Sequence, residues 1–211
     1  MTTQEFVSKA LTASGDVSDH TWVAPEIVEI QRPEKQSFRA AVIAKKMVFV
    51  DHVKPLADQG VEVIVNFPKV GMWRADAIEF CEAKGIAWGR YGVLLKALRA
   101  DFPGESRDPQ IQFPRRALSQ HTRVKEVGFI NDQLLTVRHD TGKVLRIALV
   151  YDYDLAPEDI RNARERLGEF DLVLKNNPNG SILDGVAEAA DSLGAEVFEI
   201  AGILRYLGRL K

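Results

Sequence analysis

Two carboxylates follow a strongly apolar segment near residue 150. The segment 147–151 is apolar throughout, and Asp152 and Asp154 come directly after it. Paired carboxylates at the end of a buried strand supply the oxygen ligands that Mg²⁺ prefers, so these two residues are candidates for a catalytic metal site. The alternative is a strand-to-helix turn, with Asp154 near the start of a helix that begins at Pro157. Magnesium is expected only under the first interpretation, and the sequence identifies no other cofactor.

A polar loop after a later strand is the best candidate for binding a phosphate or carboxylate. Its candidate residues are Lys175, Asn176, Asn177, Asn179, Gly180 and Ser181. A loop that leads from a strand into a helix beginning near Ile182 directs free backbone N–H groups and the positive end of the helix dipole toward an anion. We expect Lys175 to be exposed and to add a full positive charge. The alternative is that the asparagines, proline and glycine serve the turn itself and that Asn179 or Ser181 caps the helix.

A basic stretch in the middle of the chain is the candidate nucleic-acid interface. Its candidate residues are Arg115, Arg116, Arg123 and Lys125, and no acidic residue lies between the first and the last of them. Clustered cations of this kind bind phosphates in a salt-sensitive way. The alternative is a solvated linker whose charges maintain solubility.

The composition is that of a globular protein. The chain has 211 residues, 45% of them hydrophobic, and a formal net charge of −2, which argues against a generally basic nucleic-acid coat. A single cysteine, Cys81, excludes an internal disulfide, and we expect it in the core. No apolar run reaches the roughly 20 residues that a membrane span needs. A cytoplasmic protein without membrane contact is the expectation.

Strands and helices alternate over two parts of the chain. Short apolar runs predict strands at 26–30, 47–50, 61–65, 86–88, 147–151, 171–174 and 196–198. Helical spacing predicts helices at 4–12, 73–84, 93–98, 157–167, 182–193 and 203–207. Between them, 125–150 alternates around Asp140-Thr141-Gly142, which is typical of an antiparallel hairpin. The predicted fold class is α/β, with a mainly parallel sheet of Rossmann-like βαβα units and an antiparallel hairpin in the middle.

An internal duplication is the second prediction for the fold. Moving 61–99 by 109 positions onto 170–208 needs no gap and places Gly71 on Gly180 and Gly85 on Gly194. With a shift that is shorter by eight residues, 48–51 aligns with 149–152. The alternative is that any two βαβα units share this order of elements.

These patterns suggest four segments. We expect an N-terminal extension at 1–37, a first α/β repeat at 38–100, a proline-bearing linker at 101–123, and the hairpin with the second repeat at 124–211. Both repeats could form one compact domain.

The second repeat resembles a known family. The segment 171–180 (DLVLKNNPNG), followed by Ala187, Ala190 and Gly194, resembles the terminal strand–helix–strand–helix unit of Mrr-type restriction endonucleases. Catalysis in that family uses an acidic residue on one strand and an acid (or Gln)-x-Lys on the next, which bind a divalent ion and activate water. The corresponding strands here carry no Glu-x-Lys or Asp-x-Lys. The resemblance therefore implies a nuclease-like scaffold without intact nuclease chemistry.

Three functions remain open on this basis. The first is an α/β protein that binds nucleic acid or a phosphate-bearing small molecule through the basic stretch and the Lys175 loop. The second is a Mg-dependent phosphoesterase or nuclease that uses Asp152 and Asp154. The third is a non-catalytic oligomeric or ligand-sensing module, and a homo-oligomer is among the expected partners.

Overall fold

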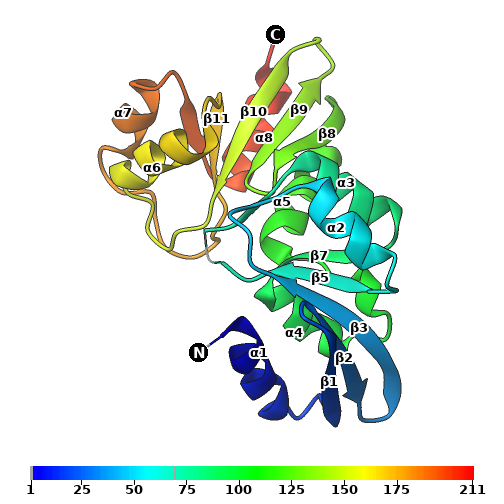
Figure 1. Ribbon diagram of the computed structural model, residues 1–211. Coiled ribbons are helices and arrows are strands. Elements are labelled where there is room, and N and C mark those ends of the chain that lie inside the picture. The colour runs from blue at the N-terminus through cyan, green and yellow to red at the C-terminus, as the bar shows by residue number, and fades with distance from the viewer. Residues whose placement is uncertain (1, 69) are drawn as a thin grey trace. The chain divides into compact units, whose positions relative to one another are not determined.

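The chain folds into two compact units, which are described separately. The computed structural model describes residues 2–68 and 70–211. Unit 1 comprises Met1–Asp108 and unit 2 comprises Pro109–Lys211, coloured blue to green and green to red in Figure 1. The division therefore falls within the predicted linker, and the predicted extension 1–37 is part of unit 1.

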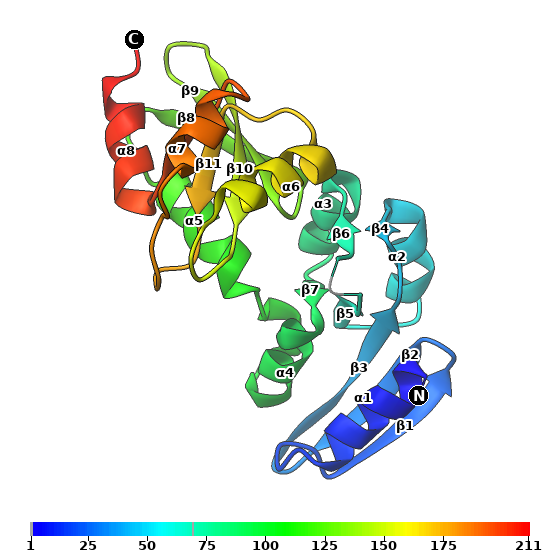
Figure 2. The ribbon, with the colours of Figure 1, turned by 90° about the vertical axis from the view of Figure 1, so that its left-hand side faces the viewer.

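Unit 1 is a five-stranded sheet with helices on its faces, and its strand order is β1-β2-β3-β5-β7. Its elements are α1 (Thr3–Thr12), β1 (Asp19–Ala24), β2 (Ile27–Arg32), β3 (Lys35–Ile43), β4 (Met47–Val48), α2 (Val50–Ala57), β5 (Val63–Asn66), β6 (Met72–Trp73), α3 (Ala75–Ala83), β7 (Ala87–Arg90), α4 (Tyr91–Arg99) and the 3₁₀ turn η1 (Pro103–Glu105). A capping box between Thr2 and Glu5 starts α1. Figure 2 shows α1 lying along β1 and β3, and its Val7 and Leu11 are fully buried in the core.

Unit 2 is also a five-stranded sheet, with the order β8-β9-β10-β11-β12. Its elements are α5 (Pro109–Ser119), β8 (Val124–Asn131), β9 (Leu134–His139), β10 (Val144–Val150), α6 (Pro157–Leu167), β11 (Leu172–Lys175), α7 (Val186–Asp191), β12 (Glu196–Phe198) and α8 (Ile200–Arg209). Alternate residues of β10 face opposite sides, so Ala148 and Val150 pack with α6 and α7. The single cysteine, Cys81 in unit 1, is fully buried as predicted.

Both sheets are mixed. In unit 1, β1-β2 and β2-β3 are antiparallel, whereas β3-β5 and β5-β7 are parallel. In unit 2, β8-β9 and β9-β10 are antiparallel, whereas β10-β11 and β11-β12 are parallel. The α/β class is confirmed, but in the two five-stranded sheets the parallel pairing is confined to β3-β5-β7 and β10-β11-β12.

The two units share their strand pairing residue by residue. Adding 107 to the unit 1 numbers converts the pair Trp22↔Val28 into Phe129↔Leu135, and the irregularity that follows each pair also coincides. Adding 109 relates the later elements, so β5 and β7 correspond to β11 and β12. The predicted alignment of 48–51 with 149–152 is wrong, because Val48↔Trp73 corresponds to the bridge Leu155↔Ile182. The strand equivalent to β10 is β3.

Equivalent glycines end equivalent helices. Gly85 and Gly194 have φ angles of +68° and +70°, in a region that residues with a side chain rarely adopt. After each, the next backbone N–H returns to the helix: Ile86 N donates to Cys81 O at 2.9 Å, and Ala195 N donates to Ala190 O at 3.0 Å. The sequence alignment of these glycines therefore reflects the same helix stop in both units.

The proline-bearing stretch is a helix rather than a linker. Residues 109–119 form α5, which belongs to unit 2 and corresponds to α1 of unit 1. Pro109 fits the first turn, where a backbone N–H has no helical partner. Pro114 lies inside the helix and leaves the carbonyl of Gln110 without its usual helical donor. That carbonyl has a donor from elsewhere in unit 2, as described below.

Candidate functional site

The two loops that carry the predicted site residues lie side by side in unit 2. The loop after β10 (151–156) and the loop after β11 (176–185) leave the same end of two parallel neighbours. Leu155 pairs with Ile182 in a parallel bridge, and Leu155 N donates to Ser181 O at 2.9 Å. We call these two loops the loop cluster. The carboxylate loop and the amide loop are thus brought together, as a shared strand end requires.

Gly180 is the point of closest approach within the loop cluster. Its φ is +73°, and a Cβ built there would lie 1.8 Å from the carbonyl oxygen of Tyr153. No side chain fits at that distance, so only glycine allows the two backbones to meet. The loop cluster is therefore a closely packed element.

The carboxylate of Asp154 holds the loops together. Its Oδ1 accepts hydrogen bonds from Ser181 N at 2.9 Å and Ser181 Oγ at 3.1 Å. Asp152 is exposed on the same loop. Within residues 2–68 and 70–211, no group of three or more His, Cys, Asp or Glu side chains is placed to hold a metal ion. Asp154 therefore holds Ser181 in place, and a catalytic role for Asp152 and Asp154 stays a prediction.

Lys175 is buried, contrary to the expectation of an exposed loop lysine. Only 3% of it is accessible. Its Nζ donates to Asn177 O at 2.6 Å and to Asn179 O at 2.7 Å. The ammonium group satisfies the carbonyls of its own loop, which explains why a lysine occupies this buried strand end. Its charge is directed to the backbone instead of to an exposed ligand.

The helix predicted to begin near Ile182 begins later. Residues 181–185 are irregular, and α7 covers only Val186–Asp191. Gly185, with φ +79°, precedes it. The helix dipole therefore does not reach the amide loop at Ser181, and this part of the anion-site argument is wrong.

The asparagines of the amide loop fix its shape. Asn177 Oδ1 accepts a hydrogen bond from Asn179 N at 3.0 Å, which closes an Asx turn. The side chain of Asn176 donates to Gln110 O, the carbonyl that Pro114 leaves without a helical donor. This bond ties the first turn of α5 to the loop cluster. Phe113 is thereby held on a helix anchored beside the loops.

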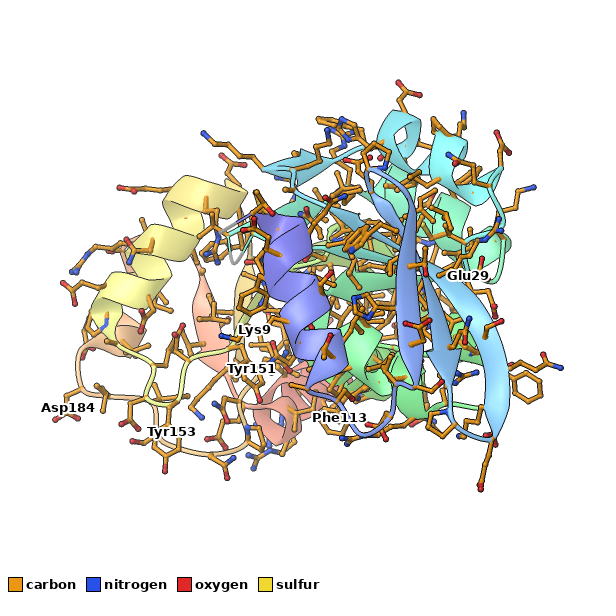
Figure 3. All side chains as sticks on the ribbon, turned by 60° about the horizontal axis from the view of Figure 1, so that its bottom comes forward. Lys9, Glu29, Phe113, Tyr151, Tyr153 and Asp184 are labelled. Carbon is orange, nitrogen blue, oxygen red and sulfur yellow. The ribbon has the colours of Figure 1, made fainter. Side chains whose placement is uncertain are left out.

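Aromatic side chains are exposed on α5 and on the loop cluster. Phe113 is 61% exposed, Tyr151 44% and Tyr153 64%; Figure 3 labels all three. Ile182 and Leu183 of the amide loop are also exposed. Exposed aromatic rings on a fixed backbone offer flat surfaces for stacking.

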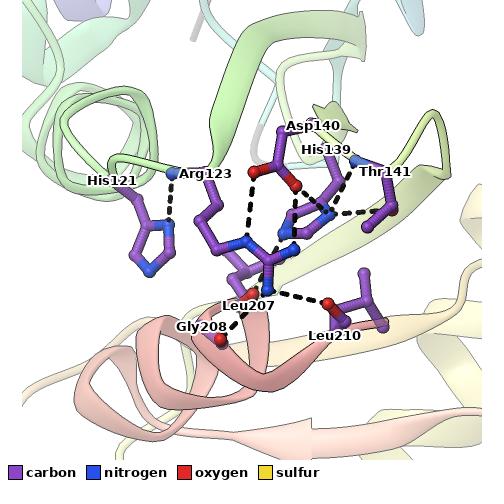
Figure 4. Close-up of polar contacts among 8 residues, drawn as sticks. All are labelled: His121, Arg123, His139, Asp140, Thr141, Leu207, Gly208 and Leu210. Carbon is purple, nitrogen blue, oxygen red and sulfur yellow. Dashed lines mark hydrogen bonds and ion pairs between the residues drawn. The ribbon is translucent and has the colours of Figure 1, made fainter.

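Arg123, a predicted phosphate ligand, is instead part of a structural network (Figure 4). Its Nε and Nη2 each donate to the Asp140 carboxylate at 3.1 Å. Its Nη1 donates to Gly208 O at 3.1 Å and Leu210 O at 2.8 Å, at the end of α8. The hydrogen bond from Arg123 holds the pKa of Asp140 below its ordinary value. With these donors used, Arg123 secures the end of α8, and its role as a nucleic-acid ligand stays a prediction.

His139 completes this network from inside. It is 1% exposed, and its Nε2 lies 3.0 Å from Leu207 O. Because a carbonyl only accepts, Nε2 carries the hydrogen of that bond. Its Nδ1 lies 2.9 Å from Thr141 Oγ1. His139 therefore caps α8 from the end of β9.

The remaining cations differ in exposure. The Arg115 guanidinium lies 4.6 Å from the centre of the Phe129 ring, so it makes a cation–π contact within the protein. Arg116 on α5 and Lys125 on β8 are exposed. Of the four predicted cations, these two project most freely into solvent.

Sequence reasoning missed several of the residues that build the site. Phe113 lies in the segment that was predicted to be a linker. If 109–119 is treated as a helix, Phe113 lies outside the buried positions Ile111, Pro114 and Leu118, and this is the signal that could have identified it. His139 and Asp140 were assigned to the hairpin and its turn. The partner of His139, Leu207 of α8, lies 68 positions further along the chain, and the partner of Asp140 is Arg123, directly before β8. No local pattern signals such a contact.

Comparison with known proteins gave no matching family model, no matching curated protein and no matching solved structure. In the part of the chain that the structure describes, no helix combines the length and apolar composition that crossing a bilayer requires.

Proposed function

We propose that unit 2 binds single-stranded nucleic acid and does not hydrolyse it. The binding surface comprises Phe113, Arg116, Lys125, Tyr151 and Tyr153, and we call it the aromatic–basic surface. The rings stack on unpaired bases beside the loop cluster, and the strand continues along α5 past Arg116 to Lys125, whose end of β8 is opposite to the loop cluster. The observation that carries the proposal is the combination of exposed aromatic rings with a helix and strand start that contain no acidic residue from Pro109 to Lys125.

The charge pattern supports this class of ligand. A chain of net charge −2 repels nucleic acid unless its positive charge is concentrated. Arg116 and Lys125 are exposed in the acid-free segment. Each contact between such a cation and a phosphate releases counterions, which makes binding salt-dependent.

The aromatic residues favour single strands over duplexes. In a duplex the bases are stacked on one another, whereas in a single strand their faces are accessible to protein rings. Stacking of a base on an aromatic side chain contributes about 1–3 kcal/mol and tolerates any sequence. A preference for single strands without strong sequence selectivity follows.

A phosphate-bearing small molecule has less support as the ligand. The Lys175 ammonium and the Asn176 and Asn177 amides hold the loop in shape. Asn179, Gly180 and Ser181 stay exposed at the rim of the loop cluster, where they could contact a base edge. The nuclease-like scaffold and a duplicated origin of the two units also remain proposals, supported by the family resemblance and by the shared pairing register.

Fluorescence anisotropy with a labelled single-stranded oligonucleotide tests the proposal. We expect saturable binding at about 50 mM salt that weakens strongly by about 200 mM. Arg116→Ala and Lys125→Ala should each lower the affinity and the slope of log K against log salt, whereas Lys84→Ala, an exposed lysine of unit 1, should change neither. Tyr153→Ala should weaken binding, with Phe102→Ala, at an equally exposed ring of unit 1, as the matched control. Absence of binding at low salt would refute the proposal.

The magnesium-dependent alternative is tested with the same oligonucleotide. Incubation with Mg²⁺ should leave it intact if Asp154 serves only to hold Ser181. Cleavage that disappears in both Asp152→Asn and Asp154→Asn would instead support the phosphoesterase reading.

A further inference from the structure

One pocket of unit 2 corresponds to a position that unit 1 fills with its own chain. The pocket has a volume of about 330 Å³ and lies at the amino-terminal end of the parallel strands, opposite to the loop cluster. Arg146, Arg164, Asp171, Leu193 and Gly194 contribute to its lining. No residue of the aromatic–basic surface is part of this lining.

In unit 1 the segment after α4 covers the equivalent residues. Gly104 of η1 is buried, and a Cβ built on it would lie 2.4 Å from Gly85 O and 3.6 Å from Glu62 O. Gly85 and Glu62 are the counterparts of Gly194 and Asp171, because Ala87 N donates to Glu62 O as Glu196 N donates to Asp171 O. A glycine-containing turn therefore packs on this backbone corner in unit 1.

The same corner in unit 2 is lined by residues of its own strands, of α6 and of the loops before β11 and β12. Among the described residues, none from beyond α8 lines the pocket. The corner repeats the φ of Gly85 at Gly194, and the backbone hydrogen bonds around it match those of unit 1. It offers the shape that accepts a Gly104-like turn.

A second observation indicates what the pocket binds. Arg164 Nη2 donates to Leu193 O at 3.0 Å, and its guanidinium lies 5.3 Å from the centre of the Phe170 ring. Its Nη1 is buried and has no hydrogen-bond partner among the described residues. A buried charged donor of this kind favours an acceptor oxygen. In unit 1 the turn's carbonyl Gly104 O accepts from Arg107 Nη1 at 2.8 Å, so a guanidinium satisfies that turn as well.

We propose that this pocket binds a glycine-containing peptide turn of a protein partner, of the Phe-Pro-Gly-Glu type found at residues 102–105 of this chain. The glycine packs against the Gly194 backbone, and a turn carbonyl accepts the free N–H of Arg164. Arg146 and Glu169, whose Nη1 and Oε2 atoms lie 3.7 Å apart, form an ion pair at the rim beside the turn.

The test is a titration of the full chain with a blocked synthetic peptide of residues 101–107, followed by NMR of the ¹⁵N-labelled protein. The expected result is saturable shifts of the amides of Asp171, Leu193 and Gly194. A peptide with valine in place of the glycine equivalent to Gly104 should produce no such shifts, because its Cβ would collide with the backbone corner.

Two protein variants complete the test. Arg164→Met removes the donor but keeps the packing on Phe170, and it should weaken peptide binding about tenfold, as expected for one hydrogen bond from a charged group. Arg161→Met, on the solvent side of the same helix, is its control. Val144→Arg, at an exposed position on the pocket rim, should abolish binding by filling the space. Shifts confined to Glu62 and Gly85, equal binding of the valine peptide, or no shifts with millimolar peptide would each overturn the proposal.

Discussion

Units 1 and 2 have the same strand order and register, yet they treat the same helix position differently. In unit 1, Phe6 of α1 packs against Phe67 and Tyr91, with ring centres 5.2 and 6.1 Å away. In unit 2 the equivalent residue is Phe113, and the positions of Phe67 and Tyr91 are taken by Asn176 and Ile200. Phe113 is 61% exposed, against 44% for Phe6. Replacing the two neighbouring rings by an amide and an aliphatic residue leaves the equivalent ring more exposed in unit 2.

A second difference concerns the strand end that fixes the loops. Asn66 ends β5 and exchanges two hydrogen bonds of 2.9 Å with the backbone of Lys45. Lys175 ends β11 at the equivalent position and binds two carbonyls of its own loop. Both residues are buried polar groups that fasten loops. Both units therefore place a buried polar side chain that holds a loop at this position, an asparagine in unit 1 and a lysine in unit 2.

The largest effect is expected at the contact glycine of unit 2. Gly180→Ala adds a Cβ 1.8 Å from Tyr153 O at a φ of +73°. Strain and overpacking together should destabilise unit 2 by about 4 kcal/mol, measured by urea denaturation. Gly194→Ala, with a similar φ and no atom within 4 Å of the added Cβ, should cost about 1–2 kcal/mol. Equal losses in the two variants would show that the loop contact is not as close as described.

Equivalent core leucines test whether the two units have equivalent interiors. Leu11 of α1 and Leu118 of α5 are both fully buried at matching positions. Leu11→Ala and Leu118→Ala should each cost about 2–5 kcal/mol of unfolding free energy. The two unfolding transitions, followed by urea denaturation, should lose similar amounts. A small loss in only one variant would indicate that its helix does not pack as its counterpart does.

The loop fasteners should give smaller effects of similar size. Lys175→Met keeps the buried stem and removes the two hydrogen bonds, and Asn66→Ala removes the equivalent pair in unit 1. Each should cost about 1–2 kcal/mol by thermal or urea denaturation, because carbonyls lose their donors. If Lys175→Met leaves stability unchanged but weakens oligonucleotide binding, the lysine contacts ligand and the structural assignment is wrong.

The smallest effect is expected from the Arg123–Asp140 pair. The pKa of Asp140 is lowered from 3.8, first by the hydrogen bond from Arg123. A depressed carboxyl pKa contributes stability that is present above its unfolded value and is lost as the pH falls through the folded value. Asp140→Asn should therefore lower the Tm slightly at pH 7 and not at acid pH below both values. Because the pair is solvent-accessible, a large change at pH 7 would contradict this account.

Local signals predicted part of the fold well. The capping glycines Gly85 and Gly194 and the alternation of strand and helix are dictated by backbone geometry and apolar spacing, and these are visible in the sequence. The equivalence of β1–β3 with β8–β10 was not visible, because only pairing register is shared and few side chains coincide. Pro114 hid α5, since a proline normally breaks a helix and its compensation by Asn176 involves a residue far along the chain.

The candidate site was predicted less well for the same reason. The carboxylate loop and the amide loop were correctly expected at neighbouring strand ends. Whether a cation reaches solvent depends on its tertiary partners. Lys175 donates to the carbonyls of 177 and 179, and Arg123 donates to carbonyls at the end of α8. Residue type and spacing identify a cation, but they do not show which acceptor it meets.

A comparison of Phe113→Ala with Phe6→Ala in the oligonucleotide-binding assay tests whether the exposed ring of unit 2 binds bases. Phe113→Ala should weaken single-strand binding about tenfold or more, as for the loss of one stacked base, and should leave the Tm nearly unchanged. Phe6→Ala should lower the Tm, because it removes ring contacts to Phe67 and Tyr91, and should leave the affinity within about twofold, since it removes no stacked base. Equal loss of affinity in both variants, or unchanged affinity in Phe113→Ala, would contradict the claim that unit 2 has exposed this position for binding.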